Sequence, residues 1–285
     1  MEKNRISKQF FMTLEKGKKT NKERIPLRFF VVTFLWSWII WMPLVLSGLG
    51  VLPLSENLLP IIGFPLIILG AFGPAVGAVY SIITLKGRKE VKIFLKSFLS
   101  LKFSWKLWLA IFLIIGLTNI LAWYLPELFG YERLPILLPN VYIFPLYWLI
   151  MVLLGGGQEE IGWRGYIMPF LESEYGLWIG NIILGFIWAA WHIPLWFVPI
   201  STQQYMPFMA FLIGCIGLSF FLSWVIKSSN GRPISGLIAH GTFNAFIPLF
   251  PTIIMEFGVP QLRFWLHEIL ILGMGIIIMS FLAKK

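Results

Sequence analysis

The chain has 285 residues, of which 58% are hydrophobic and only 13% are charged, and its net charge is +10. Water-soluble domains contain about 45–50% apolar and about 25% charged residues, so this composition excludes a soluble globular protein and indicates a polytopic membrane protein. The basic residues lie beside the apolar segments, which assigns the positive charge to membrane topology and not to nucleic-acid binding. All 13 acidic residues are glutamates, so mechanisms that need paired aspartates are excluded as well.

Residues 1–28 are polar and basic, and nine of them are Lys or Arg. A cleavable signal peptide has an apolar core of about 7–15 residues followed by a small-residue cleavage site. The apolar stretch after Arg28 is longer and shows no such site. We therefore interpret 1–28 as a cytoplasmic tail and expect a retained transmembrane helix to begin at Phe29.

Eight segments after the tail are apolar over about 20 residues, the length that a helix needs to cross the hydrocarbon core. They are residues 29–48, 60–85, 105–125, 140–158, 177–198, 207–226, 234–250 and 264–282. The sequence therefore predicts an all-α polytopic membrane protein with about eight transmembrane helices. With both termini cytoplasmic, 21 of the 23 Lys and Arg residues fall on the inner side, as the positive-inside rule requires.

Two of the N-terminal segments have further features. The second apolar segment contains Gly73 and Pro74, so we expect it to kink or to pack closely on a neighbouring helix. Residues of about 90–104 alternate Lys with pairs of apolar residues, which predicts an amphipathic helix on the membrane surface. The connections between segments are short and leave no room for a separate soluble domain.

A charged motif, Glu-Glu-Ile-Gly-Trp-Arg at residues 159–164, follows directly on the fourth apolar segment. Ionisable side chains are costly in lipid and mark a functional site by default. Glu160 and Arg164 are four positions apart, so on a helix they share one face and can pair. Glu159 is rotated from Glu160 by about 100° and stays free to act as a base. A simple interfacial charge cluster at a helix end is the alternative interpretation of this motif.

Two of the three histidines lie in later apolar segments. His192 follows the aromatic Trp188 by four positions, and His240 precedes Asn244 by four, so on a helix each pair shares one face. Polar side chains on an apolar helix point to protein or to a wet cavity. Each pair therefore predicts either a structural hydrogen bond between helices or a place in a catalytic site.

The third histidine, His267, is followed by Glu268 in the last apolar segment. A zinc-protease His-Glu-x-x-His motif needs a second histidine four positions after the first, and Ile271 stands there instead. We therefore expect His267 to lie at the outer end of the last helix and to be non-catalytic.

Taken in chain order, the motifs at 159–164, at His192 and at 240–244 resemble those of the CAAX prenyl protease and bacteriocin-processing (CPBP, or Abi) family of intramembrane proteases. The resemblance is to the type II CAAX prenyl endopeptidases in particular, and it covers residues of about 153–246. The second motif of this family usually reads Phe-x-x-x-His, and Trp188 stands here in place of the Phe. The eight-helix layout with cytoplasmic termini is also similar to this family.

The resemblance implies a role for each motif residue. The catalytic residues are Glu159 as the general base that activates water, His192 as a residue that helps to hold this water, and His240 with Asn244 as the oxyanion hole. The supporting residues are Glu160, Arg164 and Trp188. The chain then divides into the basic tail 1–28, the N-terminal transmembrane helices 29–140 with their amphipathic segment, a CPBP-like catalytic core 141–250, and the last transmembrane helix with a basic C-terminus, 251–285.

The function implied is that of an intramembrane endopeptidase, which hydrolyses membrane-associated substrates of the prenylated CAAX or bacteriocin-like type by a Glu-activated water. A non-enzymatic bacteriocin-immunity factor or membrane scaffold is the alternative, and a small-solute or proton transporter fits less well because we find no paired halves. No cofactor is favoured, and zinc bound in a His₂Glu manner by Glu159, His192 and His240 is the alternative. The expected partners are a peptide or lipidated protein and the lipid bilayer, without nucleic acid, in a prokaryotic plasma membrane.

Overall fold

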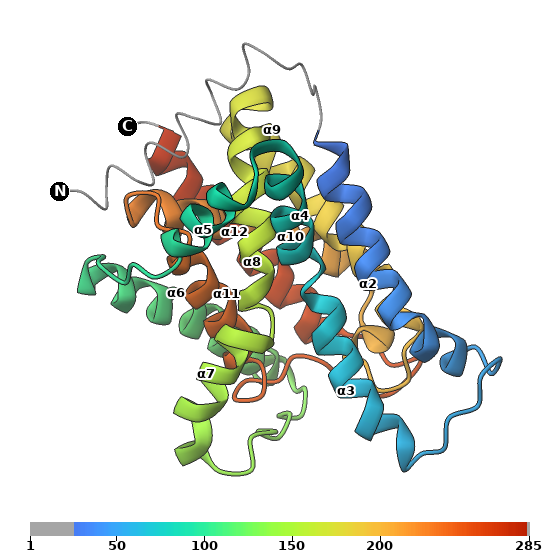
Figure 1. Cartoon of the computed structure of the whole chain (residues 1–285). Coiled ribbons are helices and arrows are strands. Elements are labelled where there is room, and N and C mark those ends of the chain that lie inside the picture. The colour runs from blue at the N-terminus through green and yellow to red at the C-terminus, as the bar shows by residue number, and fades with distance from the viewer. Residues whose placement is uncertain (1–25, 284–285) are drawn as a thin grey trace.

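The computed structural model describes residues 26–283, so nearly all of the predicted tail and the last two lysines lie outside the described residues. Within them the chain forms helices joined by short turns and loops, with no strand, which confirms the all-α prediction (Figure 1). The helices are α2 Leu27–Gly48, α3 Leu58–Ala71, α4 Gly73–Lys86, α5 Arg88–Ser97, α6 Trp105–Tyr124, α7 Phe144–Leu154, α8 Glu160–Gly162, α9 Met168–Trp191, α10 Phe208–Ser228, α11 Ile234–Phe246 and α12 Leu262–Ala283.

Six helical stretches of the described chain are long and apolar enough to cross a membrane, and the protein is an integral, multi-pass membrane protein. One of these stretches, Val141–Phe197, has 57 residues and contains a kink, because Gly176 within α9 has the non-helical angles φ 79° and ψ 170°. Helix α11 has only 13 residues, fewer than the 20 or so that span the hydrocarbon core. The number of crossings therefore stays a prediction.

Three predicted segments differ from the helices that form. The segment 140–158 is shorter, because α7 ends at Leu154 and three glycines follow. The segment 234–250 ends at Phe246, two residues before Pro248, which has no N–H with which to continue a helix. The amphipathic helix predicted at 90–104 is α5, which covers Arg88–Ser97, while the residues after it form turns. The expected kink in the second segment is present as the break between α3 and α4.

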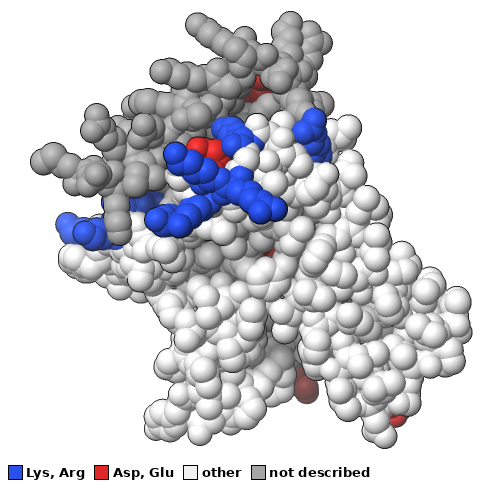
Figure 2. All heavy atoms as spheres, in the orientation of Figure 1, with Lys and Arg blue, Asp and Glu red and all other residues white. Residues whose placement is uncertain are grey.

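Helix α5 has the amphipathic character that its lysines predicted. Phe94 is 1% exposed and packs into the protein, whereas Lys92 and Lys96 are exposed. Figure 2 shows that Lys and Arg gather on the face in view at the end of the molecule where α5 lies, and that the opposite end of this face is almost free of them. This arrangement agrees with the one-sided distribution that the positive-inside rule predicts.

The central helices pack closely because small residues line their contacts. Helix α10 packs against α9 and α12, and α11 packs against α7 and α6. A Cβ atom on Gly217 of α10 would lie 2.5 Å from the backbone nitrogen of Leu272 in α12, and one on Gly185 of α9 would lie 2.7 Å from the Cα of Ile216. Small residues at such positions let membrane helices approach closely, and here they bring the ends of α9, α10, α11 and α12 around one cavity.

Candidate active site

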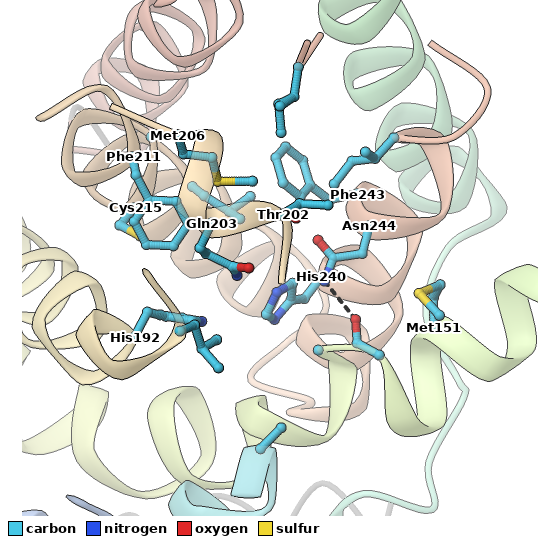
Figure 3. Close-up of a pocket in the computed structure, with 18 of the residues that line it drawn as sticks. Met151, His192, Thr202, Gln203, Met206, Phe211, Cys215, His240, Phe243 and Asn244 are labelled. Carbon is cyan, nitrogen blue, oxygen red and sulfur yellow. Dashed lines mark hydrogen bonds between the residues drawn. The ribbon is translucent and has the colours of Figure 1, made fainter. Parts of the chain in front are cut away.

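A cavity of about 470 Å³ lies among these helices. Its walls are largely apolar, and its polar lining includes residues from the turn after α7, the end of α9, the segment before α10, α11 and the start of α12. Figure 3 shows His240 and Asn244 extending from one helix into this space, with His192 facing them from another element. The cavity also includes Trp41 of α2 and Ile67 of α3, so it extends beyond the predicted core at 141–250.

The turn between α7 and α8 brings the backbone against α11. Gly156 has φ 121°, a conformation that side-chain-bearing residues rarely adopt. A Cβ atom there would lie 2.3 Å from Nδ2 of Asn244 and 2.8 Å from Nε2 of His240. Gln158 holds the turn, since its Oε1 accepts a hydrogen bond from the Gly156 backbone N–H at 2.9 Å and its Nε2 donates to the Leu154 carbonyl at 3.0 Å. The turn thus breaks the predicted helix and places Glu159 at the cavity.

Glu159 lines the cavity and is only 5% exposed. Its Oε2 accepts a hydrogen bond of 2.9 Å from Nε1 of Trp188. No other hydrogen bond to this carboxylate is present among the described residues, so Oε1 is free for a small molecule in the cavity. Trp188 therefore fixes one oxygen of the predicted base and leaves the other available.

Glu160 points away from Glu159 into a fully buried polar cluster. Its Oε1 accepts hydrogen bonds of 2.9 Å from NH1 of Arg164 and of 2.9 Å from Nδ1 of His240. The ion pair expected from the four-residue spacing is therefore present, with both side chains fully buried. The Arg164 guanidinium also lies 4.6 Å from the centre of the Trp188 ring, a cation–π contact. A short π-helix, Trp163–Ile167, carries Arg164, and such helices often occur at functional sites.

The two predicted histidines present the same ring nitrogen to the cavity side. Nδ1 of His192 donates to the Trp188 carbonyl at 2.8 Å, because a carbonyl can only accept, so in the neutral ring Nε2 carries the lone pair. Nδ1 of His240 is held by Glu160, and its Nε2 is the atom that faces Gly156. The edge of the Trp188 ring contacts His240 at a centroid distance of 5.1 Å, so one tryptophan contacts both histidines.

Asn244 lies one helical turn after His240 and shares its face of α11. Its Nδ2 donates to the Gly155 carbonyl at 2.6 Å. This bond sets the orientation of the amide, because only the nitrogen can donate to a carbonyl. The amide nitrogen has a second N–H, which is available to another acceptor near Gly156.

A zinc ion bound in the His₂Glu manner would need Glu159, His192 and His240 as its ligands. No three or more His, Cys, Asp or Glu residues in the described part of the chain stand close enough together to hold a metal ion. The His240 bond to Glu160 is of the kind that also orients metal-bound histidines, but the three side chains do not form a ligand set in this structure. We therefore derive no chemical step through a metal.

The structure brings all seven predicted residues together. The four predicted catalytic residues line the cavity, and so does Trp188. The ion pair of Glu160 and Arg164 lies behind this lining. Two lining residues were not expected here. His267 and Glu268 of α12 are 2% and 6% exposed and line the same cavity, and His267 lies near the start of this helix, at the end of it that the sequence predicted. Glu268 could have been predicted to lie at a functional site, because an ionisable residue inside an apolar segment is costly unless it faces protein or a cavity.

The fold and geometry can be compared with known proteins. Residues 141–246 match the family described as type II CAAX prenyl endopeptidase Rce1-like. Over 103 residues the chain is 31% identical to "CAAX prenyl protease 2" of Methanococcus maripaludis, a match that covers 34% of this chain and 38% of the relative. The matched region thus spans well under half of that relative's length. Both matches fall on the segment that carries the seven motif residues, and over this segment the chain is similar to the type II CAAX prenyl endopeptidases that its motifs resemble.

Proposed function

We propose that the protein is an intramembrane endopeptidase in which Glu159 activates a water molecule to hydrolyse a peptide bond of a membrane-associated substrate. One observation carries the proposal. A buried carboxylate with one free oxygen shares a cavity with the Nε2 atoms of two histidines and with the amide of Asn244. Base, water-holding group and oxyanion donors are the parts that peptide hydrolysis requires.

The water in this mechanism lies between Glu159 and His192. Trp188 occupies Oε2 of Glu159, so Oε1 accepts one water hydrogen. Nε2 of His192 carries a lone pair when Nδ1 donates to the Trp188 carbonyl, and it accepts the other. Glu160 does not compete as a base, because Arg164 and His240 already bind its carboxylate.

The oxyanion of the tetrahedral intermediate forms near His240 and Asn244. The second N–H of Asn244 donates to it, because the first is held by Gly155. Nδ1–H of His240 donates to Glu160, so Nε2 donates only in the imidazolium form, for which Glu160 is the adjacent counter-ion. A cationic donor stabilises developing negative charge more strongly than a neutral one in a water-poor cavity.

The reaction balances without a cofactor. A water proton passes to Glu159 as the water oxygen bonds to the peptide carbonyl carbon, whose oxygen becomes the oxyanion. The intermediate then collapses, the C–N bond breaks, and Glu159 returns the proton to the leaving nitrogen. The products are a new carboxyl group and a new amino group, and Glu159 is ionised again.

For the substrate we propose a peptide held at the membrane by a prenyl group, in line with the name of the relative from Methanococcus maripaludis, "CAAX prenyl protease 2". The largely apolar lining of the cavity favours apolar residues or a hydrocarbon chain beside the scissile bond. A bacteriocin-like precursor with an apolar segment offers similar chemistry. Farnesylated and unmodified versions of one peptide distinguish the two classes.

The test uses the full chain, purified in detergent or in liposomes, with a fluorescent farnesylated peptide that ends in a CAAX sequence. Glu159→Gln is expected to reduce turnover by about 10²–10⁴-fold, the usual contribution of a general base. Glu56→Gln, at an exposed position far along the chain from the motifs, is the matched control and should cleave like the wild type. Cleavage by Glu159→Gln at the wild-type rate contradicts the assignment, and binding without any cleavage by the wild type supports a scaffold or immunity protein instead.

A second arm of this test addresses metal. We expect turnover to survive prolonged chelation, because the mechanism above needs only protein groups and water. Loss of activity on chelation, with recovery on adding zinc and not magnesium, would overturn the metal-independent mechanism in favour of a His₂Glu zinc site.

A further inference from the structure

We propose that Glu268, supported by His267, forms a subsite of the cavity that binds a basic side chain of the peptide substrate. This inference rests on the proposed function and adds a part of its specificity. Both residues lie near the start of α12 and line the cavity that also contains Glu159. Cys215 of α10, which lines the same cavity, lies close enough to Glu159 and to Glu268 to interact electrostatically with both.

The packing of α10 against α12 leaves space for this carboxylate. A Cβ atom on Gly214 would lie 1.4 Å from Oε2 of Glu268, so any other residue at this position would displace the side chain. Glu268 is 6% exposed, and a buried carboxylate in an apolar segment is costly and is a functional-site candidate by default. Helix packing alone does not require it, because an apolar side chain fills such a space without that cost.

Glu268 has no Lys or Arg partner among the described residues, unlike the buried Glu160. Oε1 of Glu268 accepts a hydrogen bond of 3.0 Å from Nδ1 of the neighbouring His267. No Lys or Arg pairs with it within residues 26–283, whereas Glu160 is bound by Arg164. Nε2 of His267 is also buried, with no hydrogen-bond partner in the same residues. The site therefore has a carboxylate without a Lys or Arg partner and a buried ring nitrogen without a hydrogen-bond partner, on two residues that line the cavity.

A basic side chain is the ligand that completes this site. The ammonium of Lys or the guanidinium of Arg supplies both a positive charge and several N–H donors. The ring of His267 stacks on that of Phe243 at a centroid distance of 5.5 Å, and Phe243 and Phe264 line the cavity beside it. Aromatic faces favour a cation that has left water. A neutral side chain would leave the carboxylate without a counter-charge.

The experiment measures binding, so that it does not depend on turnover. Peptides identical except at one position carry Lys, Arg, norleucine or Glu there, and the position is moved through the residues around the expected cleavage site. Affinities are measured for the full-length Glu159→Gln protein. At one position we expect Lys and Arg to bind at least about tenfold more tightly than norleucine, a typical range for one charge-assisted contact, and Glu to bind more weakly than norleucine.

The double variant Glu159→Gln with Glu268→Gln should lose this preference, so that the ratio of the Lys and norleucine affinities falls to about one. Adding Glu56→Gln instead should leave the ratio unchanged. Equal affinities for all four peptides at every position, or a preference that survives Glu268→Gln, would overturn the subsite. The peptide series on the protein with Glu268 intact decides the question even where the double variant does not fold. Failure of the wild type to cleave any peptide counts against the proposed function alone.

Discussion

Glu160 and Glu268 are both buried glutamates, but Glu268 lines the cavity whereas Glu160 lies behind its lining, and their partners differ. Glu160 accepts hydrogen bonds from Arg164 and His240, two residues of different helices. Glu268 accepts one from its chain neighbour His267, and its carboxylate fills the space that Gly214 leaves on α10. The first carboxylate is paired with a buried Arg through its Oε1, although its Oε2 has no hydrogen-bond partner among the described residues. The second has no Lys or Arg partner among these residues, and this difference in counter-charge separates a structural support from a place for a ligand.

The strongest test of this comparison removes the positive partner of Glu160. Arg164→Met leaves a fully buried carboxylate with His240 as its remaining partner, and breaking a buried pair in this way costs about 3–5 kcal/mol. We expect a large fall in the thermal unfolding midpoint in detergent, followed by intrinsic fluorescence. Glu268→Gln should cause a much smaller fall, because it removes no pair with Lys or Arg and its amide oxygen still accepts from His267. Equal falls in the two variants would erase the distinction.

The next effect concerns catalysis on the α11 side of the cavity. Asn244→Ala removes an N–H that we assign to the oxyanion, and the loss of one such donor typically lowers the rate by about 10²–10³-fold. Because this interaction forms only in the transition state, kcat should fall while the affinity for a non-cleavable peptide stays nearly constant. Thermal unfolding of the same variant controls for the lost bond to the Gly155 carbonyl. A loss of affinity without a loss of rate would favour a binding protein.

These contrasts also explain which parts could be predicted from the sequence. The pairing of Glu160 with Arg164 and the shared face of His240 and Asn244 follow from helix geometry within four residues, and the structure contains both. Their meeting with Glu159 and His192 was expected only through the family resemblance, because spacing along the chain does not place four segments around one cavity.

The parts that could not be predicted depend on contacts between distant segments. A continuous helix over 140–158 was expected because apolar residues fill it up to Leu154, but Gly156 adopts φ 121° to approach α11. The place of His267 at the cavity was not predicted, and it results from the close packing of α10 and α12. Both outcomes involve glycines whose neighbours are distant along the chain, since Gly156 contacts residues 84 and 88 positions later and Gly214 contacts one 54 positions later.

The smallest effect that we predict concerns Trp188, which stands where the family pattern usually has Phe. Trp188→Phe keeps the aromatic ring beside Arg164 and His240 but removes the N–H that binds Oε2 of Glu159. A hydrogen bond to a charged group contributes about 1.5–3 kcal/mol, so we expect kcat/KM to fall by about 10- to 100-fold with little change in thermal stability. Because the bond positions Glu159 and takes no part in the reaction, we expect Trp188→Phe to change both the maximum of the kcat–pH profile and its position along the pH axis.

Trp36→Phe is the matched control. It removes a comparable N–H, which donates to the Leu69 carbonyl outside the cavity, and should leave kcat/KM within about twofold of the wild type. If Trp188→Phe and Trp36→Phe behave alike, Glu159 is positioned by the surrounding packing and not by the indole N–H, and the family's Phe and this chain's Trp are then equivalent.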